Sequence, residues 1–217
     1  MGGISVASTA PRPVGRSNGR RPSRGNTKMK LYFSPTTSSL ATHIALIECG
    51  ADFELIPRFL ANEETRTPEF KAINPDGKVP VLVTDDGHVI TEVAATLYYL
   101  ARKYPAANLW PEGDLNAEAE VMSWLSFAAS TLHGSRGKGA EAMDHAFSVV
   151  DQKLSDRDWL TGRYTIADIH VFRIYWKFKT ALEAPAGTYP ALEAYHDRML
   201  ARPAVAQALD VEDGFKP

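Results

Sequence analysis

Residues 74–96 read NPDGKVPVLVTDDGHVITEVAAT and combine several signals that dictate the backbone within one short segment. A turn at residues 74–77 is followed by Val79-Pro80 where a strand should begin, although proline cannot donate a hydrogen bond to a neighbouring strand. Residues 85–87 then predict a hairpin turn, and Glu92 stands where a helix begins. The segment therefore predicts two short strands and a helix, with a proline that something other than the sheet must require.

The residues before this segment predict the rest of a small α/β domain. Periodicity and turn residues indicate a strand over 30–34, a loop over 35–38, a helix over 39–48, a strand over 53–58 and a short helix near 67–70. Together with the opening segment this gives the order βαβαββα over residues 29–104.

The residues after it predict a second, all-α domain. Residues 105–115 hold two prolines and a glycine and are interpreted as a linker, and residues 116–217 show helical periodicity. Thr165-Ile166-Ala167-Asp168 forms a capping-box pattern at a helix start. A last helix is expected to stop at Arg202-Pro203.

Composition narrows the class of protein. With 217 residues and 44% hydrophobic residues the chain can build a proper core, and no apolar run approaches the roughly 20 residues that a membrane span requires. The single cysteine, Cys49, rules out an intramolecular disulfide and a cysteine zinc cluster, and it favours a reducing compartment. We therefore expect a cytoplasmic globular protein.

The first 28 residues differ from the rest. They hold six basic residues and no acid, so removing their +6 from the net charge of −2 leaves −8 on the remainder. The tail is rich in Gly, Pro, Ser and Arg, which predicts disorder. Two other interpretations are a transit peptide and an upstream start codon with the functional protein beginning at Met29.

The motifs, in their order and spacing, resemble those of the cytosolic glutathione transferases, over roughly residues 29–203. The resemblance is greatest to the bacterial beta-like branch and rests on Met29-Lys30-Leu31-Tyr32, Pro35, Ser39-Leu40-Ala41, His43-Ile44, Asn74-Pro75, Lys78-Val79-Pro80, Thr91-Glu92 and Leu132-His133. It implies a thioredoxin-like N-terminal domain with a cis-proline and an all-α helical-bundle domain after it.

The resemblance assigns a partner to each group of glutathione. A cis Pro80 would turn the backbone of Val79 toward the cysteinyl backbone. Glu92 would pair with the γ-glutamyl ammonium, and the N–H of Val93 at a helix N-terminus would bind the adjacent carboxylate. Lys78 would hold the glycyl carboxylate, although a solvent-facing lysine beside a turn is an equal alternative.

The loop at residues 35–39 is expected to stabilise the glutathione thiolate. In the beta-like pattern a cysteine stands at the position of Ser38, so we expect Ser38 to act as a hydroxyl donor and thiol exchange to be disfavoured. Thr36 and Thr37 are alternatives for that role, and Thr37 and Ser39 are expected at the glutathione site. A simpler alternative is that Ser38 or Ser39 only caps the helix.

His133 matches an active-site histidine of the helical domain in the beta-like branch. A hydrogen bond to the thiol is one role, and capping of a helix end is the alternative. The lysine that would follow is Gly134 here, and Arg136 or Lys138 could resupply its charge. The stretch from His133 to Trp159 is shorter than the resemblance leads us to expect. The helices that wall the electrophile pocket should therefore be truncated, which predicts an open pocket.

Together these features predict a glutathione transferase, or a related glutathione-dependent lyase, dehalogenase or isomerase, with a role in detoxification. The expected ligands are glutathione as co-substrate and a small hydrophobic electrophile. We expect no metal cofactor and no binding to a membrane or to nucleic acid. The resemblance also implies a homodimer. The alternative is a non-catalytic module of this fold that binds ligands or a protein, whereas a glutaredoxin-like reductase would need a cysteine in the loop rather than Cys49.

Overall fold

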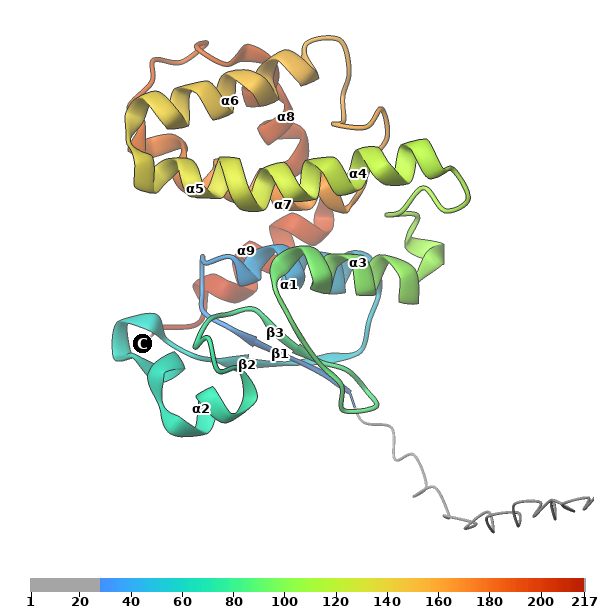
Figure 1. Cartoon of the computed structure of the whole chain (residues 1–217), viewed down its shortest axis with the longest axis vertical. Helices are drawn as coiled ribbons and strands as arrows, with labels where there is room; N and C mark the ends of the chain where they lie inside the picture. The colour runs from blue at the N-terminus through green and yellow to red at the C-terminus, as the bar shows by residue number, and fades with distance from the viewer. Residues whose placement is uncertain (1–27, 217) are drawn as a thin grey trace, which may run out of the picture.

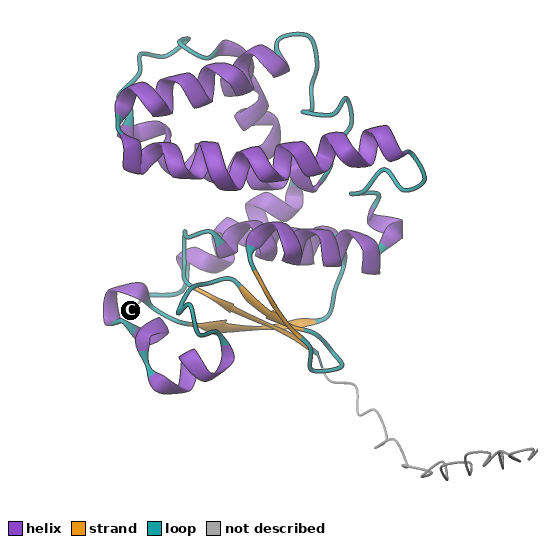
Figure 2. Cartoon of the chain, viewed as in Figure 1, coloured by secondary structure: helices purple, strands orange, loops and turns teal. Residues whose placement is uncertain are grey.

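The computed structural model describes residues 28–216, so the predicted basic tail lies outside the described residues except for Lys28. A four-stranded mixed sheet forms the centre of the first half of the chain (Figure 2), in the order β2-β1-β3-β4. Its strands are β1 (Met29–Phe33), β2 (Phe53–Pro57), β3 (Val81–Val83) and β4 (Val89–Thr91). β2 runs parallel to β1, and β3 is antiparallel to both β1 and β4.

Three α-helices complete this half. They are α1 (Ser39–Glu48), α2 (Pro68–Ile73) and α3 (Val93–Lys103), which confirms the predicted order βαβαββα. α1 and α3 lie between the sheet and the helical half, whereas α2 lies beyond the opposite face (Figure 1). Thr67 caps α2 by accepting from the backbone N–H of Phe70 at 3.3 Å, as its place before Pro68 suggests.

The second half is helical, as predicted. Its long helices are α4 (Leu115–Phe127), α6 (Ala140–Leu154), α7 (Ile166–Phe178), α8 (Pro190–Leu200) and α9 (Pro203–Asp213). Beyond Phe127 the chain passes through a π-helical turn at Ala128–Leu132 into the short α5 (His133–Ser135). Within residues 28–216 no helix has both the length and the apolar character needed to cross a bilayer.

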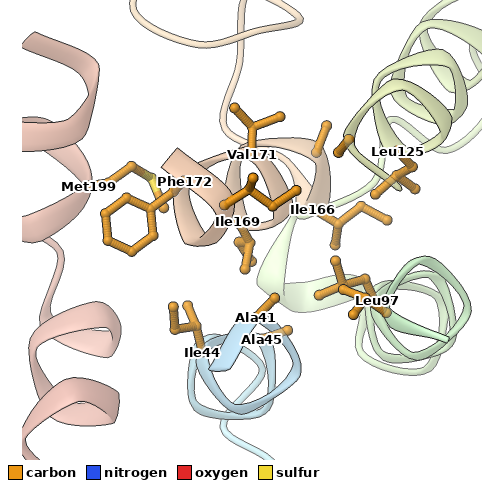
Figure 3. Packing of buried hydrophobic residues seen from close by; sticks show 14 of the residues in the cluster. Ala41, Ile44, Ala45, Leu97, Leu125, Ile166, Ile169, Val171, Phe172 and Met199 are labelled. Carbon is orange, nitrogen blue, oxygen red and sulfur yellow. The ribbon is translucent and has the colours of Figure 1, made fainter. Parts of the chain in front are cut away.

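α7 lies at the centre of the core. Its residues Ile166, Ile169 and Phe172 are fully buried, and they pack between α1 and α3 of the first half and α4 and α8 of the second (Figure 3). Both members of the predicted capping box are present: the N–H of Thr165 donates to Asp168 at 2.8 Å. The core that joins the two halves is therefore built on a helix whose start is locally encoded.

The prediction that the chain's helices end at Arg202-Pro203 is wrong. α8 does end at Leu200, but Pro203 begins a further helix, α9, because proline is well suited to the first helical position. α9 packs against α1 and carries Glu212, which is 2% exposed. This helix therefore brings a buried carboxylate beside the first half of the chain.

Candidate active site

A tight turn presents the edge of β3. The side chain of Asn74 donates to the carbonyl of Lys78 at 2.8 Å, which holds the turn closed. Gly77 has φ +65°, and a Cβ at this position would come within 2.8 Å of the Thr65 carbonyl, so only glycine fits. The Val79-Pro80 peptide bond that follows is cis, as predicted.

The N-terminus of α3 forms a second part of the site. Glu92 precedes the helix with φ 68° and ψ 130°, a conformation that a non-glycine residue rarely adopts, and its side chain is exposed. A strained backbone position of this kind persists only where the surrounding structure holds it in place. Such positions cluster at active sites and ligand-binding sites. The free N–H groups of the first helical turn, beginning with Val93, favour an anion.

The hydroxyl groups of the loop before α1 have different partners. Thr37 and Ser39 both donate to the carbonyl of Ser34, at 2.8 and 3.1 Å, and thus hold the loop together. Ser38 instead donates to the carbonyl of Val79 at 3.1 Å. Although Ser38 occupies the N-cap position of α1, its side chain makes no capping hydrogen bond. Its hydroxyl therefore lies against the edge of β3.

The helical half anchors the same loop from the other side. The backbone N–H of Thr36 donates to Glu212 Oε2 at 2.8 Å, and Lys177 Nζ donates to the Thr36 hydroxyl at 3.0 Å. Arg173 Nε donates to the carbonyl of Thr37 at 2.9 Å. Since Thr36 has φ 61°, these contacts support a backbone conformation that is costly for a β-branched residue.

These elements enclose a cavity of about 310 Å³. Most of the predicted site residues line it: Ser38, Lys78, Val79, Pro80, Glu92, Val93 and His133. Thr37 and Ser39 do not line the cavity, because their hydroxyls face the loop itself. The lining also includes residues that the sequence did not single out as site residues, namely Asn74, Ala94, Ala129 and His170.

His133 reaches the cavity from the helical half. Its Nδ1 lies 3.3 Å from Nη1 of Arg173, and its ring centroid lies 5.5 Å from that of Phe178. Although the residue as a whole is exposed, this packing removes water from the ring, and burial together with the charges of Arg173 and Arg136 lowers the pKa of His133. The helical path continues through α5 beyond His133, so the histidine does not cap a helix end.

His170 is the second imidazole at the cavity. It is 4% exposed, its Nδ1 lacks a hydrogen-bond partner among the described residues, and burial lowers the pKa of His170 to about 3. His170 and Arg173 lie one turn apart on α7. No sequence motif marks either residue, since both stand in a helix whose neighbouring positions are mostly apolar core.

Charged groups at the rim are exposed or stacked. Lys78 pairs with Asp76 at 2.8 Å on the surface, and its side chain is 70% exposed. The guanidinium of Arg136 lies 5.1 Å from the ring centroid of Phe178, a cation–π contact. Away from the rim, Cys49 caps the C-terminal end of α1, and burial raises the pKa of its thiol to about 12, which disfavours the reactive thiolate.

The site shows no donor set for a metal. Among residues 28–216, no group of three or more His, Cys, Asp or Glu side chains is arranged to hold an ion. The cavity instead offers an acid, helix N-terminal N–H groups, a hydroxyl and two neutral imidazoles. Such groups suit a polar, peptide-like ligand that carries both a positive and a negative group.

Two segments of the chain match known domain families. Residues 37–103 match "Glutathione S-transferase, N-terminal domain", and residues 134–203 match "Glutathione S-transferase, C-terminal domain". The chain is 31% identical to glutathione S-transferase GstA of Escherichia coli O157:H7 over 200 residues, which cover 85% of this chain and 98% of that protein.

Solved structures show the same similarity. A sphingomonad glutathione S-transferase complexed with glutathione superimposes with a TM-score of 0.78 at 35% identity, covering 85% of this chain and 98% of the other. A beta-class glutathione S-transferase of Sphingomonas chungbukensis gives a TM-score of 0.77 at 33% identity, with 84% and 98% covered.

Proposed function

The chain belongs to the glutathione S-transferase family, and we propose that it binds glutathione in the cavity between β3, α3 and α5 and joins the sulfur of glutathione to a hydrophobic electrophile. The observation that carries the assignment is the position of Ser38. Of the hydroxyls at the N-terminus of α1, it alone lines the cavity that Glu92, Val93 and the cis Val79-Pro80 edge also line.

The first half, residues 29–104, would hold the tripeptide. The backbone of Val79 pairs with the cysteinyl unit, Glu92 binds the γ-glutamyl ammonium, and the N–H of Val93 binds the adjacent carboxylate. Lys78 remains the candidate for the glycyl carboxylate, since it is exposed and needs only to exchange Asp76 for the ligand. Each charged group of glutathione thereby has a partner of opposite polarity.

Ser38 would stabilise the thiolate. The glutathione thiol releases its proton to solvent, and the α1 N-terminus favours the resulting anion by about 0.3–1 kcal/mol. When the ligand backbone engages the Val79 carbonyl, the Ser38 hydroxyl can rotate and donate to the sulfur. The sulfur then forms a bond to the electrophilic carbon, and the leaving group departs with the bonding electrons.

His133 would add a second donor from the helical half. A neutral imidazole at this place can donate a hydrogen bond to the sulfur or to a developing negative charge on the electrophile. Because it is uncharged, it does not repel the nearby guanidinium groups of Arg173 and Arg136. Thr37 and Ser39, which were candidates for ligand contact, would instead fix the loop through Ser34. Thr36 has its hydroxyl on Lys177 and its N–H on Glu212, which makes it an anchor of the loop.

We place the chain in the beta-like branch with serine in the position of the active-site cysteine, which disfavours thiol exchange. Its similarity to a beta-class structure supports this placement. We further propose that the protein is a cytoplasmic homodimer. Residues 105–115 would link its two domains, and residues 116–217 would form an open pocket for the electrophile. The electrophile would be small and hydrophobic.

Turnover of an aryl halide with glutathione tests the function. Ser38→Ala should lower kcat/KM by about a hundredfold, in line with the loss of one donor to a developing anion, while glutathione binding by calorimetry changes little. Ser155→Ala, which removes an exposed hydroxyl at the end of α6, is the matched control and should leave both unchanged. Tight glutathione binding with no turnover in the wild type would instead identify a non-catalytic binding module.

A further inference from the structure

Arg173 is a buried cation beside the active-site loop. It lies on α7 and is 4% exposed, yet it forms no ion pair with a carboxylate among the residues that the structure describes. Its two hydrogen bonds go to neutral acceptors, the Thr37 carbonyl at 2.9 Å and His133 Nδ1 at 3.3 Å. Its guanidinium also lies 5.9 Å from the ring centroid of Phe178. Burial lowers the pKa of Arg173 to about 10, and the nearby charge of Glu212 offsets only part of that effect, so this buried arginine calls for a functional reason.

The chemistry of the two partners fixes the proton on His133. Every nitrogen of a guanidinium is a donor, and arginine stays charged at neutral pH. Nδ1 of His133 must therefore be the unprotonated acceptor in this hydrogen bond. The single proton of the neutral ring then resides on Nε2, which has no hydrogen-bond partner among the described residues. His133 is thus held as a donor to whatever fills the cavity that it lines.

We propose that Arg173 is a positioning residue for the glutathione reaction: it joins the loop before α1 to His133 and holds His133 as the neutral Nε2–H tautomer that donates to the reacting sulfur. The inference rests on the function proposed above and extends it to a residue outside the cavity lining. One side chain thereby sets the relative position of the two halves of the site, the loop with Ser38 and the helical segment with His133.

The surroundings of His133 support the same protonation state. The titratable and charged groups that face it are Arg173 and His170 from α7, Arg136 from its own helical segment, and Lys78 and Glu92 across the cavity. Burial and the two nearby guanidinium groups lower the pKa of His133. Glu212, the carboxylate that contacts the loop, is already engaged by Thr36 and His43.

The first test is the tautomer of His133 in the wild-type protein. Nitrogen-15 NMR of the imidazole at pH 7 distinguishes Nδ1–H from Nε2–H. We expect the neutral Nε2–H form, with the ring protonating at a lower pH than an ordinary histidine does. A dominant Nδ1–H tautomer, or a ring that is already protonated at pH 7, would overturn the proposal whether or not the enzyme turns over.

The second test uses Arg173→Met, Arg173→Lys and a control. Arg173→Met should give mixed His133 tautomers, raise the pH at which the ring protonates, and lower kcat by about tenfold with a smaller change in the KM for glutathione. Arg173→Lys keeps the charge and one hydrogen bond, so it should restore part of the lost activity. Lys177→Met removes the exposed α7 cation that contacts the same loop, and it should leave the His133 tautomer unchanged.

These measurements separate the proposal from the function on which it rests. Absence of turnover in the wild type would count against the transferase function, while the tautomer would still test the role of Arg173. An unchanged tautomer and unchanged kcat in a folded Arg173→Met protein would refute the positioning role. If Arg173→Met does not fold, the wild-type tautomer and the activity of Arg173→Lys decide between the two outcomes.

Discussion

Glu212 Oε2 accepts a hydrogen bond from the backbone N–H of Thr36 at 2.8 Å, across 176 positions of the chain. The other oxygen of the same carboxylate lies 3.1 Å from Nδ1 of His43 on α1, and both side chains are 1% exposed. The end of α9 thereby holds both the loop before α1 and α1 itself. A carboxylate of the second half therefore anchors the loop in which Ser38 is the proposed thiolate donor.

Removal of this carboxylate should weaken the fold and the site together. Glu212→Ala leaves the Thr36 N–H and the His43 ring buried without a partner, so we expect a loss of about 3 kcal/mol of unfolding free energy. Urea denaturation measures the loss, and activity should fall with it because the loop loses its anchor. Asp213→Ala is the matched control: its side chain is 85% exposed, and the change should stay within about 0.5 kcal/mol. Equal effects of both substitutions would contradict the anchoring role.

A cysteine at position 38 should acquire disulfide chemistry. In Ser38→Cys the thiol stands at the N-terminus of α1, which favours its thiolate. This thiolate should attack oxidised glutathione, form a mixed disulfide and release one reduced glutathione. Intact-mass spectrometry detects the added glutathionyl group. The wild type should remain unmodified, since Cys49 is partly buried and burial raises its thiol pKa to about 12. Modification of Cys49 in the wild type would show that the helix N-terminus is not the deciding feature.

Gly77 and Gly87 provide a matched pair for the turn before the cis-proline. Both have positive φ, +65° and +88°, but only at Gly77 would a Cβ approach another backbone atom, the Thr65 carbonyl at 2.8 Å. Gly77→Ala should therefore cost about 1–2 kcal/mol more unfolding free energy than Gly87→Ala, which bears only the left-handed backbone penalty. Glutathione affinity should fall only in Gly77→Ala, because that turn positions Val79. Equal stability of the two variants would mean that the Thr65 contact relaxes freely.

Acid sensitivity should come in part from His170. Its folded pKa, about 3, lies below the ordinary value of 6.5, so the unfolded chain binds more protons between these two values. The stability that neutral His170 supplies is thus present above about pH 6.5 and is lost as the pH falls toward 3, with a slope of at most about 1.4 kcal/mol per pH unit. His170→Phe should flatten the dependence of unfolding free energy on pH between 6.5 and 5. His145→Phe, at an exposed position on α6, should not.

Local signals in the sequence predicted the first half closely. The cis Val79-Pro80 bond was expected from the family resemblance, and the structure confirms it. The structure also confirms the bounds of α1 at both ends, the hairpin and, in the second half, the capping box of Thr165 and Asp168. Each of these features depends on residues within a few positions of one another, through turn geometry, proline chemistry or helix capping. Proline at Pro203 misled the prediction because the same residue both stops one helix and begins the next.

By itself, the sequence determined the order of the elements, the family and the edge on which a peptide-like ligand is expected to lie. Only the tertiary structure decided which loop hydroxyl faces the cavity, since Thr37 and Ser39 bond locally to Ser34, whereas folding brings Ser38 to Val79, 41 positions away. It likewise brought Glu212 and Arg173 to a loop more than 130 positions away. Local propensity cannot encode such contacts, because they exist only once the packing of α7 and α9 against α1 has closed the core.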